Sequence, residues 1–492
     1  MSPLLSQRLR DSASVVFASP RRWQQWALAV FLLAYFLYFE WDSLKVHFSS
    51  DEMFSMWSYW HGPWRLLAAQ FKLWEFYFRP MAGVFYVPVF LKFGLNPVPY
   101  HAALLTLLLA VVYQVYRLAR VLGAGELASA LAALIACYHE GLGHVYFNTV
   151  FIGDTLCCLF YLTAFVYYAH IRASGKFPGS RQTAAILGLY VCALNSKETA
   201  ATLPLILLVY ECVYHEAPNW RWADLARWIR GPGRVVLFTG CLNLLYLYSR
   251  AVAPDALRRN PAYRLVFSRG RILDFQMNSL SDLLLTWNTF DWHWVLGIWA
   301  LLTYLAWRRK RPVLRFCWFY MLLTPLPIEF VQGRHGPYLY TSLAGWAVFA
   351  SVVFADLVSA ASTFLAGEPI FRRLGRPALS AILVVSCVFL WARQNRILKE
   401  SQLKPEMENL SPQTWDAIQQ LRELNPRIRP GSQVVFLDDP FHNFDMAFIA
   451  ELSFKDRSVT VRLNQATPLS PKEIAAADYV FTFEAGKLVQ VR

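Results

Sequence analysis

Long, uninterrupted apolar runs constrain the fold of this chain more than any other feature. The first, Trp26–Phe39, reads WALAVFLLAYFLYF and is preceded by basic residues. A run of this length crosses most of a bilayer when it is helical. Because comparable runs recur as far as Ala378–Trp391 and do not alternate with polar residues, they predict an α-helical polytopic membrane protein of about 11 transmembrane helices.

The predicted helices differ in how they meet the bilayer. Two amphipathic pieces, Trp57–Trp74 and Arg79–Phe93, mix aromatic and basic residues and are expected to lie in the interface. The spans expected after the first are His101–Leu122, Leu127–Tyr138, Val150–His170, Thr183–Leu194, Thr199–Tyr214, Val235–Ser249, Leu283–Trp307, Leu314–Phe330, Tyr338–Val358 and Ala378–Trp391.

Composition supports a membrane protein over a nucleic-acid-binding one. Of the 492 residues, 56% are hydrophobic and only 16% are charged, whereas soluble domains carry about 25% charged residues. The net charge of +14 would suit a nucleic-acid binder. The arginines, however, lie in short loops between apolar runs, where they orient helices and meet anionic headgroups. We therefore expect the membrane, and no nucleic acid, as a partner.

Basic residues also predict the orientation of the chain. Four arginines precede the first span, and Lys and Arg beside a first span favour the cytoplasmic side. The N-terminus is therefore expected inside, with the first span as a signal anchor and the C-terminus outside. The outer loop Ala251–Asp282 breaks the bias with several arginines. Either the span count slips there, or these arginines bind something anionic.

The C-terminal part has a different character. Residues 1–393 are expected to form the transmembrane domain, and the more polar residues 394–492 a small extracytoplasmic α/β domain. Its expected helices are Pro412–Leu424 and a segment near Phe444–Leu452, and its expected strands are Gln433–Leu437, Val459–Leu463 and Tyr479–Phe483.

Alternation of the spans places several polar clusters on the same outer face. Ionisable groups at membrane level are costly and are usually paired or functional, so their convergence means more than any single residue. The clusters are Asp51-Glu52, Arg79-Pro80, His139-Glu140 through Asp154, Asn195–Glu198 and Gln332–Tyr340.

Each candidate residue also has an ordinary explanation. Asp51 fits a solvated loop carboxylate, and Asp154 would complement the helix dipole at the start of a span. Lys197 is either half of an interfacial charge pair or a phosphate ligand. Arg334 either snorkels to the headgroups or clamps a phosphate with its planar donor fork. Glu52 is equally compatible with a structural neighbour and a metal ligand.

Taken together, these clusters resemble the GT-C class of integral-membrane glycosyltransferases. The resemblance covers about residues 20–360 and is closest to the protein O-mannosyltransferase and aminoarabinose-transferase group, including the TMTC type. The tail does not match the tetratricopeptide tail of that last type. The motifs that carry it are Asp51-Glu52, Arg79-Pro80, Asp154 at the mouth of a span, SKExxxxLP at Ser196–Pro204 and RxxxYLY at Arg334–Tyr340.

The resemblance implies transfer of a sugar from a polyprenyl-phosphate donor to an acceptor hydroxyl of a protein, lipid or glycan. Asp51 would be the general base, and Glu52 and Asp154 would assist it or hold a divalent cation, Mg or Mn, that some members need. The residues implied in binding the lipid phosphate are Arg79, Lys197 and Arg334.

The expected chemistry needs these residue types. A carboxylate must receive the proton of the attacking hydroxyl, and cations must neutralise the charge that grows on the departing phosphate. Two other functions stay open. A transporter or flippase of a lipid-linked substrate is disfavoured because the charges lie at span ends and no repeat is evident. A non-catalytic scaffold would tolerate loss of Asp51. The expected location is a bacterial inner membrane, with the endoplasmic reticulum as the alternative.

Overall fold

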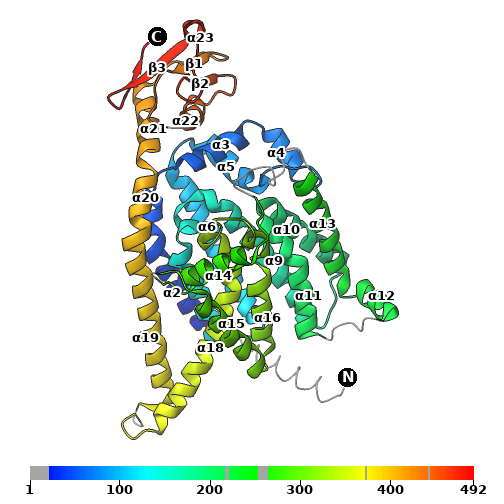
Figure 1. The fold of residues 1–492 in the computed structure, drawn as a ribbon. Helices are drawn as coiled ribbons and strands as arrows, with labels where there is room; N and C mark the ends of the chain where they lie inside the picture. The colour runs from blue at the N-terminus through cyan, green and yellow to red at the C-terminus, as the bar shows by residue number, and fades with distance from the viewer. Residues whose placement is uncertain (1–21, 216–220, 253–263, 287, 372–373, 442–443) are drawn as a thin grey trace.

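A tall helical body carries a small sheet at one end (Figure 1). The computed structural model describes residues 22–215, 221–252, 264–286, 288–371, 374–441 and 444–492. Arg8, Arg10, Arg21, Arg258 and Arg259, on which part of the charge argument rests, lie outside the described residues.

The described residues contain six helical stretches long and apolar enough to cross a membrane. The chain is thus a multi-pass helical membrane protein, although the expected count of about 11 spans is not established. The helices that form these stretches are α2 (Arg22–Glu40), α6 (Pro97–Val121), α9 (Ile152–Ala173), α13 (Gly233–Val252), α18 (Tyr340–Gly367) and α19 (Gly375–Leu398). Shorter helices pack among them: α5 (Pro80–Phe93), α7 (Glu126–Cys137), α10 (Ser180–Ser196), α11 (Leu203–Tyr214), α15 (Trp292–Arg308) and α16 (Pro312–Leu323).

Two expected spans are wrong in their bounds. The span expected at Leu283–Trp307 is interrupted, because α14 (Arg269–Leu283) ends where it was to begin and α15 starts only at Trp292. Leu285 adopts the left-handed conformation (φ 53°), which stops the helix. The span expected at Leu314–Phe330 ends early as α16, and the short α17 (Leu326–Glu329) follows Pro325. Proline has no backbone N–H with which to continue the ladder.

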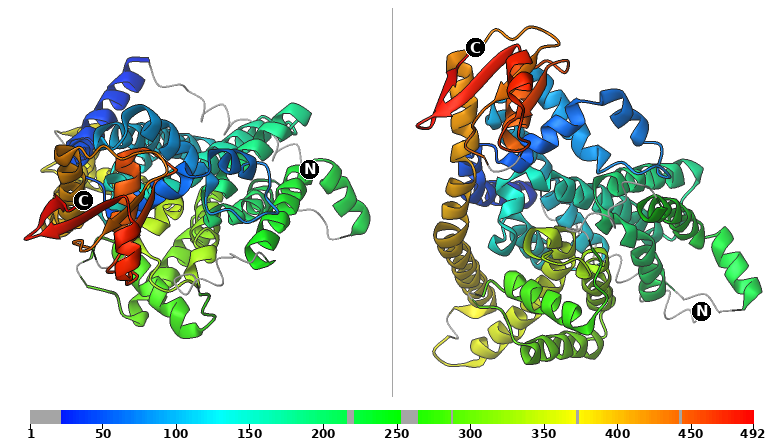
Figure 2. Two further views of the ribbon diagram at one scale, coloured as in Figure 1. Left: turned by 90° about the horizontal axis from the view of Figure 1, so that it is seen from above. Right: turned by 45° about the horizontal axis from the view of Figure 1, so that its top comes forward.

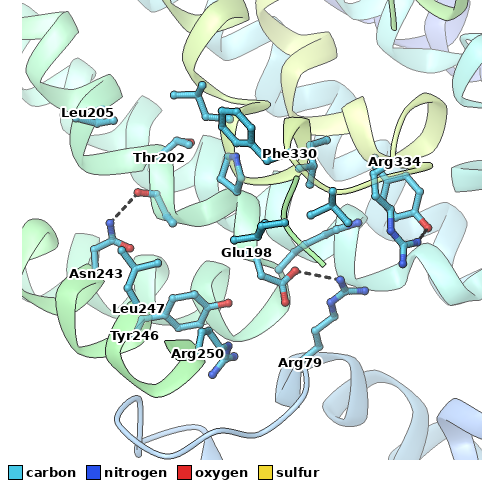
Figure 3. Close-up of a pocket in the computed structure, with 18 of the residues that line it drawn as sticks. Arg79, Glu198, Thr202, Leu205, Asn243, Tyr246, Leu247, Arg250, Phe330 and Arg334 are labelled. Atoms are coloured by element: carbon cyan, nitrogen blue, oxygen red, sulfur yellow. Dashed lines mark hydrogen bonds and ion pairs between the residues drawn. The ribbon is translucent and has the colours of Figure 1, made fainter. Parts of the chain in front are cut away.

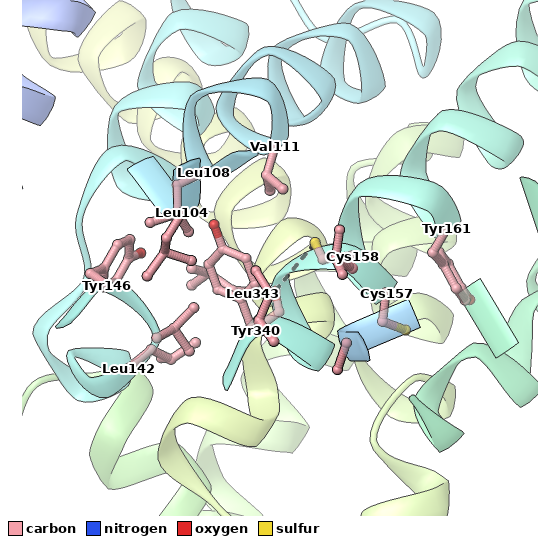
Figure 4. Close-up of a cluster of buried hydrophobic side chains, with 14 of the residues drawn as sticks. Leu104, Leu108, Val111, Leu142, Tyr146, Cys157, Cys158, Tyr161, Tyr340 and Leu343 are labelled. Carbon is pink, nitrogen blue, oxygen red and sulfur yellow. Dashed lines mark hydrogen bonds between the residues drawn. The ribbon is translucent and has the colours of Figure 1, made fainter. Parts of the chain in front are cut away.

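Helix α9 lies at the centre of the body. It packs against α6 and α10 and also contacts α18, and most of its residues are buried. Tyrosines and cysteines fill the space between these helices, as Figure 4 shows for Tyr146, Cys158 and Tyr340. The thiol of Cys158 lies 3.9 Å from the carbonyl oxygen of Tyr340. The start of α9, which carries Asp154, is therefore fixed by packing on several sides.

The C-terminal part contains the expected helices and strands. The sheet has the order β2-β1-β3-β4; β1 pairs in parallel with β2 and β3, and β4 is antiparallel to β3. Strand β4 was not expected, because a short polar edge strand has little sequence signal. The elements are α21 (Pro412–Leu424), β1 (Gln433–Phe436), α22 (Asp445–Phe454), β2 (Thr460–Leu463), α23 (Pro471–Ala476), β3 (Tyr479–Glu484) and β4 (Lys487–Gln490).

The helical path from membrane to sheet is continuous. The expected domain boundary at residues 393/394 falls inside α19, which runs on through η8 (Lys399–Leu403) and α20 (Lys404–Leu410). The sheet lies beyond α3 (Ser50–Trp60), as Figure 1 and the right-hand view of Figure 2 show. Helix α22 packs on α3, where the Trp57 indole N–H donates to Glu451 (2.5 Å). The C-terminal part therefore covers the segment that holds the acidic pair.

Candidate functional site

A cavity of about 430 Å³ combines apolar walls with a group of charged side chains. Its apolar lining comes mainly from α11, α13 and the residues around α17. In Figure 3, Leu205 and Thr202 lie on one side and the charged residues on the other. Four cations from separate parts of the chain line it, together with Glu198: Arg79, Lys197, Arg250 and Arg334.

Arg79 lines the cavity from the start of α5. Pro80 begins α5, and Arg79 caps that helix in the left-handed conformation (φ 44°), which is uncommon for a residue with a side chain. Its guanidinium donates to the Glu198 carboxylate at 3.0 Å. Gly153 leaves room for this arrangement, because a Cβ atom at that position would lie 2.9 Å from the Ser196 carbonyl oxygen and 3.5 Å from the Arg79 Cδ. The left-handed backbone of Arg79 is strained, and such strain is frequent at functional sites.

Lys197 and Asp154 form a buried ion pair beside Arg79. Lys197 follows the last residue of α10, and its side chain is 1% exposed. Its ammonium donates to the Asp154 carboxylate and lies 4.2 Å from the centroid of the Tyr338 ring. Burial lowers the pKa of Lys197 to about 8, which the charge of Asp154 only partly offsets. Burial and the neighbouring carboxylate of Asp154 therefore act on the pKa of Lys197 in opposite directions.

Arg334 and Tyr338 complete this side of the cavity. The Arg334 guanidinium donates to the Tyr338 hydroxyl and lies 4.8 Å from the centroid of its ring. The Tyr338 ring thus contacts both Lys197 and Arg334. His335, the residue after Arg334, has its ring nitrogen Nδ1 2.8 Å from the Asp282 carboxylate. This contact anchors the loop to α14. One aromatic ring and one anchored loop keep two cations from different segments together.

Sequence reasoning did not single out Glu198 and Arg250 as site residues. Burial by itself would raise the pKa of Glu198, but the charges of Arg79 and Arg250 lower it to about 2. Arg250 lies near the end of α13, 4.1 Å from the centroid of the Tyr246 ring. A signal for Arg250 was present, since it directly precedes the arginine-rich loop Ala251–Asp282, which breaks the expected charge bias.

Glu52 lies apart from the cavity lining and has a structural role. It closes a capping box by accepting from the Ser49 N–H (2.7 Å) and hydroxyl (3.1 Å). Its other oxygen accepts from the N–H of Thr149 (2.9 Å) and from the Thr149 hydroxyl. Burial raises the pKa of Glu52, and these four bonds act in the opposite direction. Glu52 therefore ties α3 to the segment that leads into α9.

Asp51, the expected base, is exposed in the first turn of α3 and is not part of the cavity lining. It faces the C-terminal part, where its charge helps to raise the pKa of Asp445 at the start of α22, after burial as the main cause. The neighbouring Ser50 hydroxyl lies 3.4 Å from that of Thr414 in α21. The structure thus brings Arg79, Lys197, Arg334 and Asp154 together but leaves Asp51 and Glu52 outside that group.

Glu52 and Asp154 do not fit a shared divalent cation. The oxygens of Glu52 already accept four hydrogen bonds, and Asp154 is paired with Lys197. Within the described residues, no group of three or more His, Cys, Asp or Glu side chains is arranged to hold a metal. A divalent cation at these two carboxylates is thus implied only by the resemblance.

Comparison with known proteins identifies the fold. No protein-family model matches the sequence, and no curated protein matches it significantly. Several solved structures do match, among them an oligosaccharyltransferase and ArnT. The oligosaccharyltransferase of Archaeoglobus fulgidus, tethered with an acceptor peptide containing the NVT sequon, has a TM-score of 0.52 at 10% identity over 91% of this chain. ArnT of Cupriavidus metallidurans, bound to undecaprenyl phosphate, has a TM-score of 0.51 at 14% identity over 93% of this chain.

The chain has a GT-C fold. The match covers 92% of ArnT but only 64% of the oligosaccharyltransferase, so the chain spans less than two thirds of the latter's length. The GT-C resemblance inferred from the sequence motifs is confirmed at the level of the fold. At these identities the likeness says nothing about individual residues, whose roles must be argued from the site itself.

Proposed function

We propose that this protein is a membrane glycosyltransferase that takes a sugar from a polyprenyl-phosphate donor and transfers it to an acceptor hydroxyl on the extracytoplasmic face. The observation that carries the proposal is the cavity in which Arg79, Lys197, Arg250 and Arg334 meet apolar walls. Cations beside an apolar surface suit a ligand that is a phosphate at one end and a hydrocarbon at the other. The ArnT structure with undecaprenyl phosphate supports this ligand class.

The cations would act both in binding and in catalysis. Guanidinium groups bind phosphate through paired N–H donors, and Lys197 would add a point charge. As the sugar leaves, charge grows on the phosphate, and cations already held in place stabilise it without reorganisation. Glu198 and Asp154 hold Arg79 and Lys197 in position. A bound phosphate would compete with these two carboxylates for the same donors.

Asp51 is proposed as the general base, and Asp154 is the second candidate. Asp51 is exposed, and its side chain makes no hydrogen bond with the described residues, so an acceptor hydroxyl can reach it. Asp154 lies beside the cations, but its partner Lys197 already donates to it. A general base must come within hydrogen-bond reach of the attacking hydroxyl. Asp51 satisfies this if the acceptor enters between α3 and the C-terminal part and meets the donor sugar there, and Asp154 satisfies it if the acceptor displaces Lys197.

Sugar transfer tests the proposal. Purified protein in lipid nanodiscs is supplied with radiolabelled polyprenyl-phosphate hexoses and a cell-envelope extract, and label in the acceptor fraction is measured. We expect transfer by the native protein and its loss in folded Asp51→Asn. Equal transfer by Asp51→Asn together with loss in Asp154→Asn would move the base to Asp154. No transfer from any of several sugars, despite donor binding, would favour a flippase.

A further inference from the structure

A second cavity, a crevice of about 800 Å³, shares no lining residue with the cation-lined cavity. One wall is η1 (Trp41–Lys45) with the two residues after it, and the other is formed by η8, α20 and α21. The crevice therefore lies just beyond the ends of α2 and α19. In Figure 1, α19, α20 and α21 follow one another along one edge of the molecule up to the sheet.

The crevice lining carries as many lysines as carboxylates. Lys399 is buried and pairs with Asp42 at 2.8 Å, Lys404 pairs with Glu400 at 3.4 Å, and Asp416 accepts from the Gln420 amide at 2.7 Å. Five polar lining side chains make no hydrogen bond or ion pair with the described residues. The His47 and Trp415 rings stack on each other, and the other three side chains are Lys45, Glu408 and Gln419. One ammonium, one carboxylate and one amide are thus left to meet a ligand.

The remaining lining is apolar and well fixed. Phe147, Leu403 and Met407 are buried and form an apolar surface between the polar groups. At the side, the rings of His47 and Trp415 stack with centroids 4.1 Å apart and planes 6° from parallel. The Ser411 hydroxyl donates to the His47 carbonyl at 2.9 Å. These contacts join the two walls, so the crevice keeps its shape without a ligand.

We propose that this crevice binds an uncharged, polyhydroxylated carbohydrate. A hydroxyl is donor and acceptor at once, so a sugar with adjacent hydroxyls is satisfied where ammonium and amide donors stand beside carboxylate acceptors. The C–H faces of the sugar rings pack on the apolar surface. The volume lies within the range of small-molecule sites, about 300–1,000 Å³. An anionic headgroup would need an excess of cations, which the balanced lining does not supply. The inference does not depend on whether the chain transfers sugar.

Binding of trisaccharides tests the proposal. Full-length protein in nanodiscs of zwitterionic lipid is titrated with mannotriose, maltotriose and chitotriose, and binding is followed by saturation-transfer NMR and calorimetry. We expect saturable binding of at least one trisaccharide. Its dissociation constant should rise at least tenfold in Glu408→Gln and in Gln419→Ala. The matched controls Glu423→Gln and Gln402→Ala, both exposed and outside the crevice lining, should leave it unchanged.

Three results would overturn the proposal. One is no binding of any trisaccharide at millimolar concentration by native protein that is folded. Another is binding that Glu408→Gln and Gln419→Ala leave intact, or that Arg334→Ala in the cation-lined cavity abolishes. The third is tighter binding of glycerol 3-phosphate than of any trisaccharide with loss in the same two variants, which would identify the crevice as a headgroup site.

Discussion

Two segments that each hold a pair of adjacent charged residues, Asp51-Glu52 and Lys197-Glu198, differ in what their side chains contact. The two carboxylate oxygens of Glu52 accept four hydrogen bonds from Ser49 and Thr149, so Glu52 has a structural role. Lys197 and Glu198 instead pair with Asp154 and Arg79 at the edge of an apolar cavity. A buried charge that is saturated by local hydrogen bonds is structural, whereas an ion pair that lines a cavity can exchange its partner for a ligand.

The largest effect is expected from breaking the Lys197–Asp154 pair. Lys197→Met leaves Asp154 buried without its partner, and loss of one member of such a pair destabilises by about 3–5 kcal/mol. We expect a clear fall in the thermal unfolding midpoint and loss of donor binding. The double variant Lys197→Met/Asp154→Asn should recover the midpoint but not the binding. Recovery of both would show that the pair is structural, like Glu52.

Glu52→Gln should separate stability from activity. The amide keeps one acceptor oxygen but turns its NH₂ group toward donors, so we expect destabilisation of about 2 kcal/mol. Thermal unfolding measures this, and Thr149→Ser, which keeps the hydroxyl bond, is the conservative control. Sugar transfer per folded molecule should change less than threefold. A large loss of transfer at native stability would instead return Glu52 to a catalytic role.

Arg334→Lys tests whether phosphate geometry matters at the cavity. Lysine keeps the charge but loses the paired N–H donors and the planar contact with Tyr338. The affinity for polyprenyl phosphate should fall about tenfold, which corresponds to about 1.4 kcal/mol. Arg117→Lys is the matched control, because Arg117 also lies against a tyrosine but is not part of the cavity lining. Equal losses in both variants would contradict a specific role.

The smallest effect is the dependence on pH. Because the pKa of Lys197 is lowered to about 8 from a usual value of 10.5, the ammonium loses its proton as the pH rises through about 8. Donor affinity should fall there, and Lys197→Arg, which does not titrate, should abolish the dependence. The sign for stability is opposite. The unfolded chain binds more protons between the two pKa values, so this residue's contribution to stability rises with pH across that window. A flat binding profile in the native protein would remove Lys197 from the phosphate site.

Much of the fold could be predicted from the sequence, because apolar run length and strand pattern are local signals. The first span and α21 are where the runs predicted them. The interruption between α14 and α15 could not be predicted by run length, since leucines on both sides mask a turn that depends on Leu285. The spatial roles of Glu52 and Arg250 were likewise hidden, because their partners, Thr149 and Glu198, are distant in sequence.

The two cavities also differ in whether sequence motifs indicated them. The sequence motifs singled out Arg79, Lys197 and Arg334, and the structure shows that these residues line one cavity. No motif indicated the crevice, because it forms only where residues 42–47 meet residues 399–419. Short local patterns can identify charged groups, but only packing shows which surfaces enclose them.

The most direct test of the central claim compares polyprenyl phosphate with the polyprenol of the same chain length. Binding to native protein and to Arg334→Ala in nanodiscs is measured by native mass spectrometry. A lipid-phosphate site predicts that the native protein prefers the phosphate at least tenfold and that the variant loses most of this preference. Equal binding of the two lipids by the native protein would contradict the account, because the four cations would then have no phosphate to bind.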